Sequence, residues 1–296
     1  MKVLLRLGRV PLVAIVVWAA VVGIAPVAMA RYPAFSIQQG AAFGCAAPPS
    51  RFPGTIVPAQ NPCERPLSEV YDAPLPNIVA DAALRSAVLL AGAALLALTV
   101  GLAIGTAAAV LRRRALASGS LIGVTGLAAA VPSFFVAYFL QLSVIASTGA
   151  TGHRLLPVFG FGYDEHIVLP LLSIAVPAVA VTAQLTAARM SEVLDADFVT
   201  TANSKGLLGS WILRVHVLPH VMPVVLEALG SGLRISVASL PIVEYLFVWN
   251  GIGYIALQAI AARDPAALTA SALVIAALFS LVSAIADLGR RSLARA

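Results

Sequence analysis

Long apolar runs constrain this chain more than any other feature of its sequence. A helix needs about 20 mostly apolar residues to cross a bilayer. The 296 residues contain six such runs, at 10–30, 83–111, 120–147, 167–188, 219–246 and 266–288. The mean hydropathy is +0.95, and only 11% of the residues are charged, against about a quarter in soluble domains. The sequence therefore predicts an all-α, polytopic protein of the cell membrane with six transmembrane helices.

The basic residues predict the side on which each loop lies. Lys and Arg accumulate in cytoplasmic loops, and with a cytoplasmic N-terminus most of them fall inside, including Arg112, Arg113 and Arg114. Most acids then fall outside. We therefore expect both termini to be cytoplasmic. The net charge of +6 is spread over the ends of the apolar runs, so no phosphate-binding face and no nucleic-acid partner are expected.

Residues 1–30 allow two interpretations. Basic residues, an apolar stretch and Ala28-Met29-Ala30 are typical of a cleavable signal peptide. The apolar stretch 10–28 exceeds the usual signal core of about 7–15 residues. We favour a retained first transmembrane helix, and the orientation is the same either way.

An extracytoplasmic loop or small cap is predicted over residues 31–82, which are rich in Pro, Gly, Asn and Ser. This segment contains the only two cysteines, Cys45 and Cys63. Disulfides persist on that side of the membrane, so the two are candidates for a disulfide, with two free thiols as the alternative. Residues 83–296 then form a five-helix core.

Several catalytic chemistries are absent from the sequence. The two lysines, Lys2 and Lys205, do not follow a glycine, so a phosphate-binding G-x-x-x-x-G-K-[ST] loop is impossible. Any ATP used must be bound by another subunit. His216 and His220 have a spacing that could hold a metal on a helix, but Pro219 lies between them and no third ligand is near. We predict no catalytic residue and no metal site.

Two ionisable residues lie within the fifth run. Glu227 and Arg234 are seven residues apart, on one face of a helix. Each costs about 2.5–3.5 kcal/mol at the centre of a bilayer on insertion scales. For Arg234 we favour a place along a transport pathway or at a partner interface. For Glu227 a position at the wet cytoplasmic end of the helix is an equal alternative.

The cytoplasmic segment 190–219, between the fourth and fifth runs, is the most informative. Its pattern predicts a short helix, a break at Gly206, a second short helix and a span that begins at a proline. Asp195 or Asp197 is a candidate N-cap of the first helix. Phe198, Thr201 and Ala202 would then share one face.

This segment resembles the cytoplasmic loop of binding-protein-dependent ABC importer permeases. The family pattern is E-A-A, three residues, G, nine residues and I-x-L-P. Thr200-Thr201-Ala202 occupies the first positions, followed by Gly206 and then His216-Val217-Leu218-Pro219. The spacing fits throughout. Thr200, Thr201 and His216 depart from the pattern, so the fit rests on Ala202, Gly206, Leu218, Pro219 and their distances.

Two further motifs are similar to dipeptide, oligopeptide and nickel permeases within that family. The first joins Asp197-Phe198-Val199-Thr200-Thr201-Ala202 to Lys205-Gly206-Leu207. The second is Val243-Glu244-Tyr245-Leu246-Phe247-Val248-Trp249-Asn250-Gly251-Ile252-Gly253. Val131-Pro132-Ser133-Phe134 and Leu169-Pro170 extend the resemblance over about 120–290. The P-G-D-P typical after the first span is replaced by Ala25-Pro26-Val27-Ala28, a departure that bears on the substrate.

The resemblance implies a six-span, type I importer permease with no cofactor of its own. Its partners would be a second homologous permease, an extracytoplasmic binding protein, the lipid bilayer and two ATPase subunits, which would bind ATP and Mg. The ATPase-coupling residues would be Asp197, Thr200, Thr201, Ala202, Lys205, Gly206, Leu218 and Pro219. The pathway or gate residues would be Glu244, Phe247, Trp249, Gly251 and Gly253, to which Glu227 and Arg234 are added for their charge within a span.

Three alternatives remain open at this stage. Phe247 and Trp249 could instead be aromatic anchors at the membrane interface, with Gly251 and Gly253 forming a tight turn. The expected cargo is short peptides, with nickel or other small polar solutes as alternatives. An ion-coupled secondary transporter is a more distant one, because it would need several buried acids and only Glu227 and Glu244 lie in or near spans.

Overall fold

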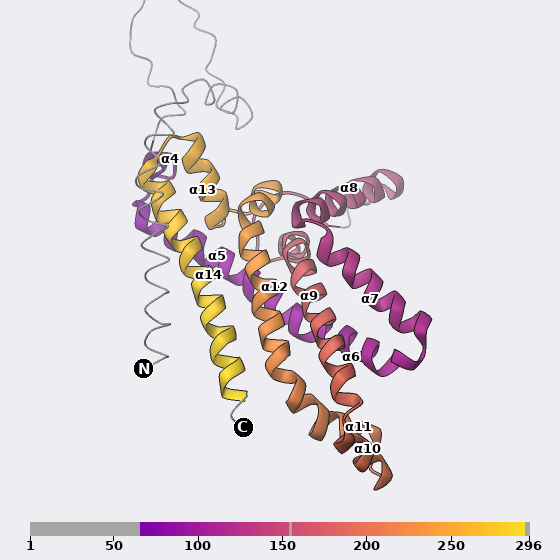
Figure 1. Ribbon diagram of the computed structural model, residues 1–296. Helices are drawn as coiled ribbons and strands as arrows, with labels where there is room; N and C mark the ends of the chain where they lie inside the picture. The colour runs from indigo at the N-terminus through magenta and orange to yellow at the C-terminus, as the bar shows by residue number, and fades with distance from the viewer. Residues whose placement is uncertain (1–65, 154–155, 294–296) are drawn as a thin grey trace, which may run out of the picture. The chain divides into compact units, whose positions relative to one another are not determined.

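The computed structural model describes residues 66–153 and 156–293, with side chains as far as Arg291. Every regular element in those ranges is helical, which confirms the predicted all-α class (Figure 1). The first predicted span at 10–30, Cys45, Cys63 and most of the predicted outside segment lie outside the described residues. In chain order the elements are α4 (Leu67–Val70), α5 (Leu75–Leu96), the π-helical turn η2 (Ala97–Gly101), α6 (Leu102–Val110), η3 (Leu111–Arg113), α7 (Ala115–Ala130), α8 (Ser133–Thr151), η4 (Glu165–Ile167), α9 (Val168–Leu194), α10 (Asp197–Ser204), α11 (Gly209–Trp211), the π-helical turn η5 (Ile212–Val217), α12 (Leu218–Phe247), α13 (Ile252–Ala261) and α14 (Pro265–Leu293).

Five helical segments are long and apolar enough to cross a membrane. They are Leu75–Arg113, Ser133–Thr151, Glu165–Leu194, Gly209–Phe247 and Pro265–Arg291. Each overlaps one of the five apolar runs predicted from residue 83 onward. The first of them begins at Leu75 rather than at residue 83, so the end of the predicted outside segment is already helical.

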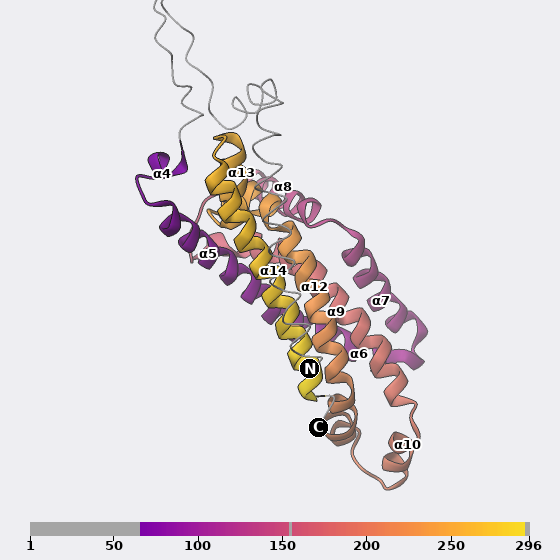
Figure 2. The same ribbon diagram turned by 60° about the vertical axis from the view of Figure 1, so that its left-hand side comes forward.

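The run 120–147 was predicted as one crossing helix, and that prediction is wrong. Two helices, α7 and α8, meet at Val131 and Pro132. A residue before proline is driven out of the helical region by a clash with the proline ring. Val131 accordingly has φ −79° and ψ 122°, and α8 departs from the line of α7 in both views (Figures 1 and 2).

The described chain forms two compact units. One comprises residues up to Ser86 together with Asn250–Leu278, and the other comprises Ala87–Trp249 together with residues from Phe279 onward. In the second unit, α9 lies between α12 and α7 (Figures 1 and 2). Close contact between α9 and α12 requires Gly232, since a Cβ there would overlap Ala178. The Ser236 hydroxyl donates to the Ile174 carbonyl over 2.7 Å at the same contact.

In the second unit, one contact at each end of α9 and α12 joins two segments of the chain. Arg112, after α6, contacts Asp195, after α9, with 2.7 Å between Nη2 and Oδ1. At the other end, the Gly160 N–H donates to the Phe247 carbonyl over 2.9 Å. Each of these contacts joins two segments that the charge pattern predicts to lie on the same side of the membrane.

The first unit is built around α4, the start of α5, α13 and the first half of α14. Its core contains Leu67, Ile78, Val79, Ala82, Ile252, Ile255, Ala259 and Ala267. Asp264 joins these elements: its carboxylate accepts from the Ala266 and Ala267 N–H groups and thereby caps α14. The same carboxylate accepts from the Leu67 N–H over 3.0 Å. One buried side chain thus fixes α4 to the start of α14.

Candidate functional site

The segment between α9 and α12 has the predicted organisation. Helix α10 covers Asp197–Ser204, the chain turns at Gly206 with φ +75°, and α11 follows. The Gly206 N–H donates to the Asn203 carbonyl and the Leu207 N–H to the Ala202 carbonyl. This pair of bonds is a Schellman motif, which needs a left-handed residue and favours glycine there. The predicted glycine break is confirmed.

The prediction that an aspartate caps α10 is wrong. Ala196 is the N-cap, and no side chain bonds to the end of the helix there. Asp197 lies in the first turn, where its negative charge suits the helix dipole. Asp195 pairs instead with Arg112. The salt bridge ties the end of α9 to the turn that follows α6.

Helix α10 has a buried face and an exposed face. Val199 and Ala202 are 4% and 8% exposed and pack in a core cluster with Met190, Ile212 and Val217. The residues Phe198, Thr200, Thr201, Asn203 and Lys205 are exposed; we call them the outer face of α10. Phe198, Thr201 and Ala202 keep the helical spacing that was predicted, but Ala202 is buried while the other two are exposed.

The remaining loop residues hold α10 against the start of α12. Pro219 lies in the first turn of α12, where a missing N–H is tolerated, and Leu218 packs against the core cluster. The ring of His220 stacks on Phe198 with 5.2 Å between centroids, and its Nδ1 lies 2.7 Å from the His216 carbonyl oxygen. Among the described residues, no group of three His, Cys, Asp or Glu side chains could hold a metal ion.

Glu227 and Arg234 lie on the exposed side of α12, in different environments. With Ser231 and Ala238 they follow a spacing of three or four residues along the helix, and all four are exposed or half-buried. We call this set the open face of α12. Glu227 is near Arg290 on α14, at 4.0 Å. The Arg234 Nη2 donates to the Ser231 hydroxyl over 2.8 Å.

The length of α12 separates the two charges by depth. Helix α12 has 30 residues, Leu218–Phe247, and about 20 of them are enough to cross the hydrocarbon. Every stretch of that length within α12 includes residues 228–237. Arg234 is inside every such stretch, whereas Glu227 is outside some of them. Glu227 also has a basic neighbour in Arg290. These facts favour the helix-end interpretation for Glu227, and the role of Arg234 along a pathway or at a partner interface stays a prediction.

The end of α12 carries the second motif, and most of its residues are buried. Val248 has φ +56°, and the bonds from its N–H to Tyr245 and from the Trp249 N–H to Glu244 form another Schellman motif. Glu244 is 0% exposed and Phe247 1% exposed. The turn at this point is made by a left-handed valine. Gly251, which is extended, is the N-cap of α13, and Gly253 lies inside α13.

Trp249 and Phe247 are not anchors at the membrane interface, which was the alternative considered above. Trp249 is 0% exposed and packs edge to face with Phe161, at 4.8 Å between ring centroids. An interfacial anchor must expose its ring to lipid headgroups, and these two side chains are enclosed by protein. Within the described residues, the Trp249 Nε1–H has no hydrogen-bond partner.

Two functional-looking residues were missed by the sequence reasoning. Arg85 lies in the middle of α5, inside an apolar run, and its Nη1 donates to the Asn250 carbonyl over 3.3 Å. The sequence signal that could have identified Arg85 is a charged residue inside an apolar run. Asp264 was counted only as an outside acid, although an aspartate immediately before Pro265 is a sequence signal for a helix start.

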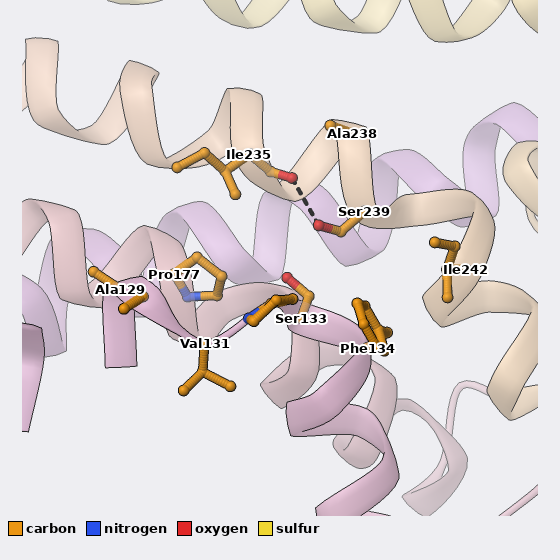
Figure 3. Close-up of a pocket in the computed structure, with 11 residues that line it drawn as sticks. Ala129, Val131, Ser133, Phe134, Pro177, Ile235, Ala238, Ser239 and Ile242 are labelled. Carbon is orange, nitrogen blue, oxygen red and sulfur yellow. Dashed lines mark hydrogen bonds between the residues drawn. The ribbon is translucent and has the colours of Figure 1, made fainter. Parts of the chain in front are cut away.

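An apolar cavity of about 250 Å³ lies beside the open face of α12 (Figure 3). It is lined by the α7–α8 joint, by Pro177 of α9 and by Ile235, Ala238, Ser239 and Ile242 of α12. Ser133 lines it from α8. The hydroxyl of Ser133 is buried without a hydrogen-bond partner among the described residues.

These features define an all-helical, polytopic membrane protein with a partly exposed helix in one of its loops. Residues 100–296 match the family of binding-protein-dependent transport system inner membrane components, and the chain belongs to that family. The match covers both motifs and the predicted core from residue 100 onward. It confirms the family resemblance and the assignment to membrane transport rather than to enzymes.

Curated relatives of the chain have been named for their cargo. The glutathione transport system permease protein GsiC of Salmonella typhimurium is 29% identical over 192 residues, covering 64% of this chain and 60% of the relative. The peptide transport system permease protein SapB of the same organism is 30% identical over 222 residues, covering 65% of this chain and 68% of the relative. The chain spans less than two thirds of the length of GsiC.

Proposed function

We propose that this chain is the membrane-spanning permease subunit of an ATP-driven importer that moves short peptides by alternating access. In this proposal residues 10–30 form the first of six spans, 31–82 contribute an outside cap, and both termini are cytoplasmic. A second homologous permease, two ATPase subunits and an extracytoplasmic binding protein complete the importer. ATP and Mg are bound by the ATPases, so this chain needs no cofactor.

The observation that carries the proposal is the two-sided character of α10. Val199 and Ala202 fix the helix to the core cluster, while the outer face of α10 is exposed. A partner that binds the outer face therefore pulls on the core. Because the cluster includes Met190 of α9 and Val221 of α12, movement of a docked α10 is transmitted to two long helices. This is the mechanical link that ATP-driven reorientation requires.

Short peptides are the proposed cargo because the second motif resembles that of peptide permeases and the relatives named above are peptide and glutathione permeases. Nickel or another small polar solute is the alternative cargo. The transport step makes and breaks no covalent bond in the cargo.

Affinity co-purification from native membranes tests the proposal through a matched pair of variants. Thr201→Glu places a charge on the outer face of α10, so we expect a stable chain that recovers much less ATPase. Ala202→Glu places the same charge in the core cluster, and we expect a drop in the amount and thermal stability of the chain itself. Burying an unpaired carboxylate costs several kcal/mol.

The contradicting results are distinct. Undiminished recovery of ATPase with Thr201→Glu would place the docking surface elsewhere. If the wild-type chain purifies with no ATPase in mild detergent, the importer proposal fails, and proton- or sodium-coupled transport through Glu227 and Glu244 becomes the explanation to test.

A further inference from the structure

Among the described residues, no acid forms a salt bridge with Arg234. A guanidinium has five N–H donors, and within the described residues its hydrogen bond goes to the Ser231 hydroxyl alone. The acid on the same face, Glu227, lies near Arg290. Arg234 is therefore held on the open face of α12 with most of its donors available.

The position of Arg234 along α12 determines what can neutralise it. The helix has 30 residues, and at about 1.5 Å of rise per residue Arg234 is about 20 Å or more from either end. Arg234 lies inside every stretch of about 20 residues of α12 that could cross the hydrocarbon, and an arginine within a membrane span needs a counter-charge or polar partners. Planar carboxylates match the paired N–H donors of arginine better than any other common anion except phosphate.

The cavity next to Arg234 adds a second recognition element. Ile235 follows Arg234 directly and Ala238 is one turn further on, and both line the cavity (Figure 3). Its walls are apolar except for serine hydroxyls. The Ser239 hydroxyl already donates to the Ile235 carbonyl. Ser133 is 3% exposed, and its hydroxyl has no partner among the described residues, so it is the wall group available to bond to a ligand.

We propose that Arg234 and this cavity receive the C-terminal residue of a peptide in transit. The guanidinium binds the terminal carboxylate, and the cavity takes an apolar side chain next to it. This inference rests on the proposed function and deepens it, because it assigns a contact for the cargo within the permease itself. An acid from the partner permease would supply the same charge but would leave the adjoining cavity unexplained.

Uptake of paired peptides by cells that depend on this chain tests the carboxylate contact. Wild type and Arg234→Gln are compared with a radiolabelled dipeptide and with its C-terminal amide. We expect Arg234→Gln to lower uptake of the free acid on the order of tenfold, because a site built for a polar group discriminates strongly. Uptake of the amide should stay within about twofold of wild type. Dividing variant by wild type for each peptide removes any preference of the binding protein.

Arg113→Gln is the matched control, because it removes an exposed arginine from the α6–α7 turn and should leave the ratio of acid to amide unchanged. Equal losses of acid and amide in Arg234→Gln would overturn the proposal and assign Arg234 to structure. Loss of the co-purifying permease would also overturn it and assign Arg234 to the subunit interface. If wild type takes up neither peptide, the proposed peptide importer fails first, and the cargo contact fails with it.

A second variant tests the cavity. Ala238→Phe fills it from the open face, so uptake of a dipeptide ending in phenylalanine should fall at least about fivefold more than uptake of one ending in glycine. Recovery of ATPase should be unchanged. An equal fall for the two peptides would show that the cavity does not receive the C-terminal side chain.

Discussion

The two Schellman turns at Gly206 and Val248 end helices at opposite ends of the same unit, and they differ in what surrounds them. Gly206 follows the exposed α10, and a Cβ placed there would meet nothing within 4 Å. Val248 follows α12 between two side chains that are almost fully buried, Phe247 and Trp249. Both lie in motifs that resemble the same family. The first motif presents a surface, and the second builds a core.

A motif that matches a family is therefore not by itself evidence of an accessible site. At Gly206 the left-handed backbone is provided by a residue that adopts it without strain. At Val248 a β-branched residue is held in that conformation, at a cost of about 1–3 kcal/mol, and the surrounding contacts must offset it. Packing of the surrounding side chains therefore fixes the end of α12, whereas the glycine itself fixes the end of α10.

Removing Trp249 should have the largest effect on this comparison. Trp249→Ala deletes a fully buried ring that packs on Phe161, and a loss of about 3–5 kcal/mol in stability is expected for such a truncation. Thermal unfolding of the detergent-solubilised chain measures it. Trp211→Ala is the control, since Trp211 is 56% exposed and should cost little. Equal effects from the two variants would contradict the buried core at this end.

Exchanging the residue type at the two turns should change stability by an intermediate amount, with a loss at Gly206 and no loss at Val248. Gly206→Val forces a β-branched residue into the left-handed region and should destabilise the end of α10 by about 1–2 kcal/mol. Val248→Gly relieves the same strain and should leave stability unchanged or raise it by about 1 kcal/mol. Thermal unfolding gives both signs, and ATPase recovery should fall only for Gly206→Val. A destabilising Val248→Gly would mean that the valine side chain contributes more packing than strain.

The loop before α9 should give the smallest effect. A hydrogen bond from His166 lowers the pKa of the Asp164 carboxyl, with a second bond from the His166 N–H acting in the same direction. Because the pKa of Asp164 is lower in the folded protein, its ionised carboxylate stabilises the fold at pH values above the usual pKa of 3.8. This stabilisation is lost as the pH falls through the lowered pKa. The small difference in melting temperature between wild type and Asp164→Ala should therefore be present at neutral pH and vanish in strong acid. If this difference in melting temperature grew on acidification, the protonated rather than the ionised carboxyl of Asp164 would be the stabilising form.

Sequence reasoning predicted local features well and burial poorly. The extent of α10, the break at Gly206 and the proline start of α12 follow from neighbouring residues, so the sequence was sufficient. The inward orientation of Ala202 depends on Ile212 and Val217, which pack on it after the chain has turned. Trp249 is enclosed by a ring from the loop before α9, a contact that no local pattern contains. Pro132 was a sequence signal for the break within 120–147, but the length of the apolar run favoured a single helix.

The carboxylate of Asp264 has a consequence for the order in which the protein is completed. Its bond to the Leu67 N–H joins residues 197 positions apart in the chain. At a synthesis rate of about 5–20 residues per second, Leu67 leaves the ribosome roughly 10–40 seconds before Asp264. During that interval the Leu67 N–H lacks this acceptor, and α4 has no contact with α14. The first described helix of the chain is thus among the last to be secured, by a residue that is made near the end of synthesis.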